Sequence, residues 1–309
     1  MKKGVEMAKL KKVAYGSPVD KGANTVKLGI EKGIFEKEGL DVAVEVVFGG
    51  PEIAAAYDSG ALVMGEIGSP PAINAIAAGM NFRIVGSGTR QKAHMYFCVG
   101  KGISSYEGLR GKRLGLLGFG SCPDWFARKI MAHHGLDAEK DVEIVPLLDK
   151  YPQMLAMMET GELDACLSAE PSTSIGEAKG LYDIWAAGYE EPYLPHFQWV
   201  VRVANGDFIE REPDTVAAML RACRRSVHYA AAHVDEWVGL MVRHYGFDAD
   251  AARRSVDREL PHYERDCQID LSGLQRAVDM QYELKGIDRP RKAEELVDLR
   301  FQPDLSIAA

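Results

Sequence analysis

The 309-residue sequence has no apolar run that approaches the roughly 20 residues needed to span a bilayer. It also lacks a Lys/Arg-rich block and carries a net charge of -8, so no nucleic-acid partner is expected. Cysteine is scarce: the five thiols are odd in number, widely spaced and without a C-x-x-C pair. This pattern argues against a disulfide framework or a zinc site, and it favours reduced, buried thiols.

Motifs for metals and phosphates are missing as well. There is no H-E-x-x-H pattern, and the adjacent His133 and His134 point to different faces of a helix, so they cannot easily share an ion. The glycines at 118 and 120 are not followed by the G-K-[ST] of a Walker loop. We therefore expect neither a metal nor a cofactor.

The first twelve residues, MKKGVEMAKLKK, have the positive charge of a signal peptide but no apolar run behind it. Two expectations follow for localisation. The chain as written is cytoplasmic, or it is periplasmic or on the cell surface if an upstream signal segment has been removed.

A pattern of alternating strands and helices occurs twice. The first copy has β-rich segments at 11–16, 40–48 and 62–68, with helices predicted at 25–39, at 50–60 and from the Ser69-Pro70-Pro71 turn to Gly79. The second copy has strands at 111–118, 141–147 and 162–168, with helices at 125–135, 151–161 and 172–180. Glycine landmarks align between the copies: Gly39 with Gly135, Gly60 with Gly161, and Gly79 with Gly180.

Two such β-α-β-α-β-α units predict two α/β lobes, each with a mainly parallel sheet. One larger doubly wound sheet is the alternative. A strand at 196–204 and four amphipathic helices between 213 and 286 follow the second unit. If this C-terminal helical extension packs on the first lobe, the chain crosses between lobes near Phe97–Lys101 and near Gln198–Val201. Lobe 1 is then 1–99 with 200–309, and lobe 2 is 100–199, with a ligand cleft between them.

Several sequence segments resemble those of a known family. They are LGIEKGIFEKEGLDVAVEVVFGG, ALVMGEIGSPPAINAIAAG, SSYEGLRGKRLGL and TGELDACLSAEPS. They are similar, in this order, to segments of substrate-binding proteins that serve ABC importers for nitrate, sulfonates, taurine and thiamine precursors. The resemblance covers roughly residues 11 to 245 and implies the two-lobed periplasmic-binding-protein-like fold of type II.

Enzymes that share the fold of this family include a pyrimidine synthase with a cysteine-rich iron motif and a biphenyl-sulfinate desulfinase with a cysteine in its first loop. Neither feature is present here, since that loop is Ser17-Pro18-Val19-Asp20-Lys21.

In lobe 1, polar groups follow the ends of strands, where ligands of such sheets bind. The candidate ligand contacts are Tyr15, Ser17, Lys21, Asn24, Ser69, Pro70 and Arg90. The first loop precedes a helix N-terminus, which favours an anion, and Arg90 could hold a carboxylate or sulfonate with two hydrogen bonds. Structural roles remain open: a helix cap for Asn24 or Ser69, core packing for Tyr15, and a solvated surface position for the two cations.

In lobe 2 and the returning strand, the candidates are Phe119, Ser121, Glu170 and Trp199. Ser121 precedes a helix and could contact an anion, while Trp199 could stack on a planar ligand. Glu170 could accept a ligand N–H or close the lobes by pairing with a lysine or arginine. Cys122, at the helix start, would be a nucleophile only if its pKa were lowered; an inert small residue is the alternative.

The sequence therefore favours a solute-binding protein that captures a small anionic or heterocyclic ligand by hinge closure, for delivery to an ABC permease. The alternative is a cytoplasmic enzyme on the same frame, such as a decarboxylase, lyase or thiamine-precursor enzyme. No legible acid–base or nucleophile set supports catalysis, although a cleft can assemble one from distant residues.

Overall fold

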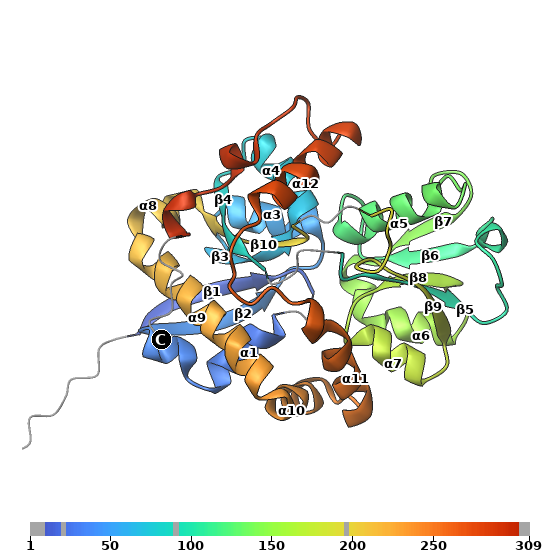
Figure 1. Cartoon of the computed structure of the whole chain (residues 1–309), viewed down its shortest axis with the longest axis horizontal. Coiled ribbons are helices and arrows are strands. Elements are labelled where there is room, and N and C mark those ends of the chain that lie inside the picture. The colour runs from blue at the N-terminus through green and yellow to red at the C-terminus, as the bar shows by residue number, and fades with distance from the viewer. Residues whose placement is uncertain (1–9, 20–22, 89–92, 195–197, 303–309) are drawn as a thin grey trace, which may run out of the picture.

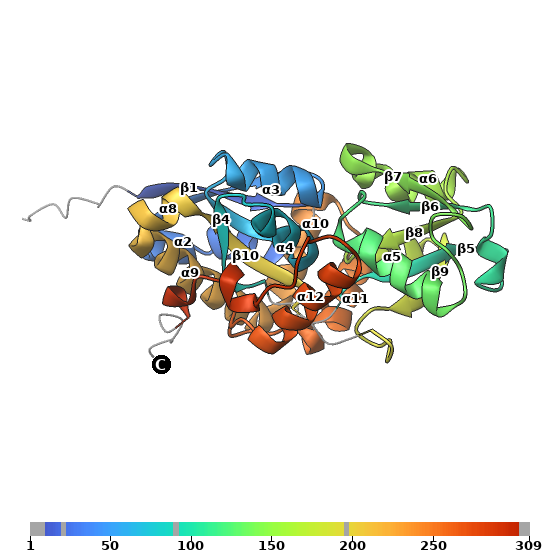
Figure 2. The same cartoon turned by 90° about the horizontal axis from the view of Figure 1, so that it is seen from above.

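The computed structural model describes residues 10–19, 23–88, 93–194 and 198–302, and it contains two five-stranded sheets side by side (Figure 1). Each sheet carries helices on its faces, so the chain forms two α/β lobes rather than one doubly wound sheet (Figure 2). The predicted two-lobed fold class is thus confirmed. No helix in the described ranges is both long and apolar enough to cross a membrane.

The first sheet has the strand order β2-β1-β3-β10-β4. Its strands are β1 (Lys11–Ser17), β2 (Leu40–Val46), β3 (Met64–Gly68), β4 (Phe82–Ser87) and β10 (Val200–Asn205). β1 is parallel to β2 and β3, while β10 is antiparallel to both β3 and β4. The connecting helices are α1 (Asn24–Glu31), α2 (Ile34–Lys37), α3 (Gly50–Asp58) and α4 (Ser69–Ala77).

The second sheet repeats this plan with the order β7-β6-β8-β5-β9. Its strands are β5 (Tyr96–Gly100), β6 (Arg113–Leu116), β7 (Glu143–Pro146), β8 (Ala165–Ser168) and β9 (Tyr182–Ala187). β5 is the antiparallel strand, paired with β8 and β9. The α-helices are α5 (Cys122–His133), α6 (Met154–Glu159) and α7 (Ser172–Ala178), and short 3-10 turns occupy Glu107–Leu109 and Leu148–Gln153.

The chain changes sheets twice, between Ser87 and Tyr96 and again between Ala187 and Val200. The predicted first crossing, Phe97–Lys101, overlaps β5, which already belongs to the second sheet, so it was placed several residues too late. The antiparallel strand of each sheet, β10 or β5, lies next to an edge strand and enters directly from the other lobe. Two adjacent chain passages therefore link the lobes.

The C-terminal extension contains α8 (Gly206–Arg211), α9 (Pro213–Ala232), α10 (Val234–Tyr245), α11 (Ala249–Glu259) and α12 (Leu271–Glu283), with 3-10 turns at Leu260–His262, Ala293–Leu296 and Leu299–Phe301. α9 packs on α1, and α12 packs on α4, as expected for an extension of the first lobe. α11 differs, because it also packs on α7 of the second lobe. α11 thus contacts both lobes, which the sequence did not indicate.

The glycine landmarks of the sequence repeat all adopt left-handed backbone conformations. Gly39 and Gly135 have φ of 80° and 76°, Gly60 and Gly161 have 74° and 75°, and Gly79 and Gly180 have 97° and 69°. Each lies shortly after a helix, where a positive φ ends the helix and glycine adopts it without steric cost. The register of the two units was therefore read correctly from these positions.

One predicted helix is divided. The segment 25–39 forms α1 and α2 instead of a single helix, because Gly33 has a φ of 65° and interrupts the α conformation. The regularly spaced apolar residues are still buried: Val26 and Phe35 lie in the core between the first sheet and α9. Hydrophobic spacing located the buried face but did not reveal the break.

We expect Gly135→Ala to lower the free energy of unfolding by about 1 kcal/mol, because alanine is strained at this φ while its Cβ would meet no atom within 4 Å. The matched control is Gly239→Ala in the interior of α10, where helix propensity should raise the free energy of unfolding by about 0.5 kcal/mol. Urea denaturation of both variants measures the difference; equal effects of the same sign would contradict the argument.

Candidate functional site

Three helices begin at one small cavity between the lobes. α3 and α4 come from the first lobe and α5 from the second, and the cavity between their starts has a volume of about 90 Å³. The lining residues are Pro18, Val19, Gly50, Gly68, Pro71, His94, Met95, Leu117, Ser121, Cys122, Pro123, Tyr151, Ala169, Trp199 and Val200. Residues from both lobes and from both chain passages thus enclose the same space.

Each of these helices has proline in its first turn: Pro51 in α3, Pro70 and Pro71 in α4, and Pro123 in α5. Proline is well suited to the start of a helix, where its φ is already helical and an N–H would lack an intrahelical acceptor. The positive ends of three helix dipoles consequently meet at the cavity and favour a negative charge there. Proline also removes N–H donors, so fewer direct hydrogen bonds are offered than three ordinary helix starts would provide.

Two glycines allow the lobes to approach closely. A Cβ atom at Gly68 would lie 2.0 Å from the Sγ atom of Cys122, and one at Gly50 would lie 3.6 Å from the Cα atom of Ser121. Gly68 has an ordinary extended backbone, so its requirement for glycine is the space taken by the opposite lobe. The helix starts of the two lobes are therefore in direct contact beside the cavity.

Aromatic and polar side chains complete the wall. The indole ring of Trp199 lies 5.9 Å from that of Trp125, measured between centroids, and both residues are buried. The Tyr151 hydroxyl donates to the carbonyl oxygen of Leu167 at 3.3 Å. His94 is buried and brings an imidazole to the cavity from the first chain passage. The wall is mainly apolar, with a few polar groups.

Two of the predicted site residues, Ser121 and Trp199, line the cavity. Ser69 lies directly beside it: its hydroxyl donates to the carbonyl oxygen of Gln198, and its N–H donates to that of Trp199 at 2.8 Å. Ser17 is buried, and its hydroxyl donates to the carbonyl oxygen of the lining residue Val19 at 3.0 Å. These serines hold the loops that form the wall.

Other predicted residues lie elsewhere. Tyr15 is in the core of the first lobe, where its hydroxyl accepts from Nε of Arg202 at 3.3 Å. Asn24 does not cap α1, which begins after Ala23; its side-chain oxygen instead accepts from the Tyr245 hydroxyl at 3.0 Å. Phe119 is 53% exposed. Lys21 and Arg90 lie outside the described residues.

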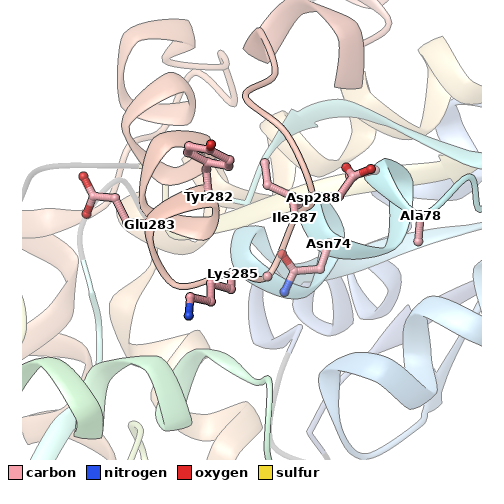
Figure 3. A pocket seen from close by; sticks show the side chains of 9 residues that line it. Asn74, Ala78, Tyr282, Glu283, Lys285, Ile287 and Asp288 are labelled. Carbon is pink, nitrogen blue, oxygen red and sulfur yellow. The ribbon is translucent and has the colours of Figure 1, made fainter.

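Pro70 lines an outer groove instead. This groove has a volume of about 480 Å³ and shares Ser121 with the cavity, while Trp125 and Arg128 come from α5 and Lys285 from the segment after α12. A larger groove of about 890 Å³ lies between α4 and that same segment, with Asn74, Tyr282 and Lys285 around it (Figure 3). It belongs to the first lobe alone and contains none of the predicted site residues. The smaller cavity, which residues of both lobes line, is therefore the better candidate site.

Sequence reasoning missed Gly50, Gly68 and His94 as parts of the site. Gly68 directly precedes the recognised Ser69-Pro70-Pro71 turn, but only the distance to the other lobe explains why it is glycine. His94 belongs to no recognised sequence motif. In the part of the chain that the structure describes, no group of three or more His, Cys, Asp or Glu side chains is placed to hold a metal.

The environment of Cys122 is unfavourable for a nucleophile. Its thiol is buried, and burial raises its pKa, whereas the N-terminal position in α5 would by itself favour the thiolate. Desolvation therefore outweighs the helix dipole here, and the inert interpretation of this residue is the better one.

We expect Cys122 to stay unmodified when the folded protein is treated with iodoacetamide at pH 7.5, because its thiol is both buried and protonated. Peptide mass spectrometry after a short exposure measures this, and the same treatment in 6 M guanidinium chloride should label all five cysteines. Rapid, selective alkylation of Cys122 in the folded protein would contradict the assignment.

Comparison with known proteins agrees with this architecture. A protein of Bacillus subtilis (strain 168) named "Putative aliphatic sulfonates-binding protein" is 27% identical over 303 residues, covering 94% of this chain and 87% of the relative. The alkanesulfonate-binding protein SsuA from Xanthomonas axonopodis pv. citri, solved bound to MOPS, superposes with a TM-score of 0.77 at 17% identity and covers 94% and 98% of the two chains. The periplasmic nitrate-binding protein NrtA from Synechocystis PCC 6803 superposes with a TM-score of 0.76 at 14% identity, covering 96% and 87%.

These structural likenesses establish the fold alone, because the sequence identities of 17% and 14% are low. A family model described as NMT1/THI5 like matches residues 25–237, which include the whole second sheet and every strand of the first sheet except β1, and which extend into α10. This span is well over half of the chain. The protein therefore belongs to the NMT1/THI5-like family.

Proposed function

We propose that this chain is a solute-binding protein that captures a small anionic ligand between its lobes for ABC-type import. The observation that carries the proposal is the cavity of about 90 Å³ at the starts of α3, α4 and α5. Because residues of both lobes enclose it, a solute bound there contacts both of them only when they are together. Binding then shifts the population toward the closed form, which is the form a permease would recognise.

The size and lining of the cavity narrow the ligand class. The cavity volume of about 90 Å³ is well below the roughly 300–1,000 Å³ of typical small-molecule pockets. Such a space suits a compact anionic head with a short apolar group rather than a large heterocycle. The apolar wall around Met95, Leu117 and Trp199 would contact the apolar group, and the three helix dipoles would face the anion. A short-chain sulfonate or carboxylate fits these requirements, and the sulfonate class agrees with the names of several relatives.

Catalysis on the same frame is the weaker alternative. Among the described residues that line the cavity, Cys122 is the obvious nucleophile, and burial raises its pKa. A thiol that stays protonated near neutral pH supplies little thiolate for attack. This observation favours binding over an acyl-transfer or desulfination type of reaction.

The proposed role in import also specifies the cellular location of the protein and its partner. The closed protein would dock on a membrane permease, and capture would take place on the outer side of that membrane. This part of the proposal rests on the relatives and on the two-lobed fold. Cell fractionation with an antibody against the chain would test it.

We expect ethanesulfonate to stabilise the folded protein. At 100 times its Kd, a ligand that binds only the folded state adds about 2.7 kcal/mol to the free energy of unfolding. Thermal-shift and calorimetric titrations would compare it with taurine, nitrate, acetate and a methylpyrimidine. Ethanesulfonamide is the matched control, because it has nearly the same shape without the negative charge. Equal affinity for the sulfonamide, or no response to any of the anions, would contradict the proposal.

We expect Gly68→Ala to weaken binding of the best anion about tenfold, because its Cβ atom would collide with Sγ of Cys122 when the lobes close. Cys122→Ala should change affinity little. The double variant should recover most of the loss, since the Cβ atom of residue 122 lies at an acceptable 3.5 Å. Calorimetry on the three variants measures this; failure of the second substitution to rescue would show that closure at this contact does not govern binding.

A further inference from the structure

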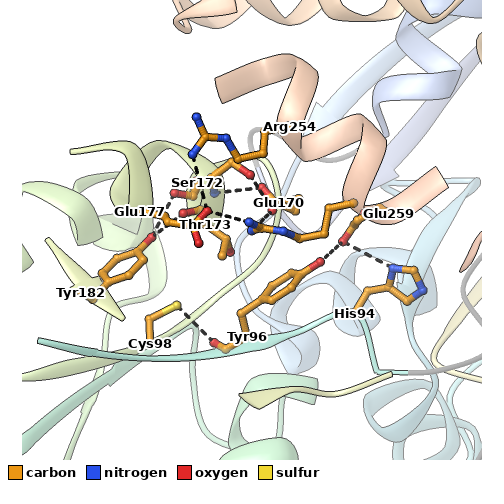
Figure 4. Close-up of polar contacts among 12 residues, drawn as sticks. His94, Tyr96, Cys98, Glu170, Ser172, Thr173, Glu177, Tyr182, Arg254 and Glu259 are labelled. Atoms are coloured by element: carbon orange, nitrogen blue, oxygen red, sulfur yellow. Dashed lines mark hydrogen bonds and ion pairs between the residues drawn. The ribbon is translucent and has the colours of Figure 1, made fainter. Parts of the chain in front are cut away.

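α11 has two faces that contact different lobes. Ala252 and Val256 are buried against α10, in a cluster that also contains Trp237 and Leu240 of the first lobe. Arg254 and Arg258, four residues apart and therefore on one side of the helix, both pair with Glu177 of α7 in the second lobe. Figure 4 shows Arg254 beside Glu177. The sequence pattern of this short helix thus combines an apolar stripe for one lobe with a basic stripe for the other.

Arg258 joins two carboxylates of the second lobe. Its guanidinium donates from Nη1 to Glu170 at 2.7 Å and from Nη2 to Glu177 at 2.6 Å. The Glu170 side chain is 2% exposed and that of Arg258 19% exposed. Glu170 also accepts from the N–H of Ser174 at 3.0 Å and from its hydroxyl at 2.8 Å, so its carboxylate is fully engaged.

A second contact runs from the next residue of the same helix. Glu259 is buried and accepts from the Tyr96 hydroxyl of β5 at 3.5 Å and from the Tyr263 hydroxyl at 3.0 Å. Its Oε1 atom also lies 3.4 Å from Nδ1 of His94. Since His94 lines the cavity, this contact connects α11 with the wall of the candidate site. The guanidinium of Arg258 lies 5.6 Å from the centre of the Tyr96 ring.

The cost of separating these groups follows from their burial. Burial raises the pKa of Glu170 to about 7, the nearby Glu259 adds to the rise, and Arg258 opposes it. Removing the guanidinium while the lobes stay together would leave a buried carboxyl group beside Glu259 without its counter-charge. Without Arg258 the closed arrangement also loses the two hydrogen bonds that join α11 to Glu170 and Glu177, so we expect the variant protein to open more readily.

We propose that Arg258 is a positioning residue that holds the second lobe against α11, so that the C-terminal extension sets how readily the cleft opens. Arg258 acts through Glu170 and Glu177 and does not line the cavity. The proposal deepens the proposed function, because it assigns the control of closure at the same site. It can be tested without any solute, so it can fail or succeed independently of solute capture.

The test uses the full chain with spin labels at two exposed positions, one near the carboxyl end of β2 in the first lobe and one just after β7 in the second, introduced by Glu45→Cys and Lys150→Cys. Pulsed electron resonance then measures the distance between the lobes without ligand. We expect the parent protein to populate the short distance, and Arg258→Met to lose at least half of that population. Arg258→Lys keeps the charge and should retain most of it.

Arg253→Met is the matched control, since Arg253 lies on the same helix but pairs with Asp235 of α10, within the first lobe. It should leave the distance distribution unchanged. Circular dichroism and urea denaturation establish that every variant is folded. An unchanged distribution in folded Arg258→Met, or a parent protein that shows only the long distance, would overturn the proposal.

Discussion

The close contact between the starts of α4 and α5 is the constraint on which the candidate site depends. Gly68 leaves room for the Cys122 thiol of the other lobe, and Gly50 leaves room for the backbone at Ser121. These approaches bring helix starts from two separate sheets to one cavity. A larger side chain at Gly68 would keep the lobes apart, and the dipoles of α3 and α4 would then no longer face that of α5. Shape complementarity between backbones, rather than a strong charge pair, defines this part of the molecule.

The contact between α11 and the second lobe depends on polar groups instead of a close backbone fit. Arg258 and Glu259 of α11 contact carboxyl and hydroxyl groups of the second lobe, and His94 lies between Glu259 and the cavity. Buried ionic groups of this kind stabilise little by themselves but penalise any arrangement in which one partner is left alone. The closed arrangement of the lobes therefore requires both the close fit at Gly68 and the matched polar partners of α11.

Much of the fold could be predicted from the sequence, because the repeat carries its own landmarks. The aligned glycines at helix ends and the β-branched strands defined two units, and both sheets contain the expected parallel strands. The antiparallel β5 and the edge strand β9 could not be recognised, since their pairing depends on strands far away in sequence. The break at Gly33 was missed because an apolar period continues across it.

The site was predicted less well, for a physical reason. Ser121 and Trp199 follow strand or helix boundaries that the sequence reveals, and they line the cavity. Glu170 was expected either to bind a ligand or to pair across the lobes, and the structure pairs it with Arg258. Tyr15 and Asn24 lie at equally plausible boundaries but point toward Arg202 and Tyr245. Sequence position indicates the end of the sheet at which a residue lies, whereas the direction of its side chain depends on tertiary neighbours.

The placement of β10 has a consequence for the order of folding during synthesis. All strands of the second sheet lie within residues 96–187, so this lobe can assemble as soon as that contiguous stretch has left the ribosome. β4, by contrast, is joined to the rest of the first sheet only through β10 at residues 200–205. Domains generally fold as units during synthesis. The lobe encoded in the middle of the chain is thus the first that can be completed, whereas the first sheet stays incomplete until β10 has been made.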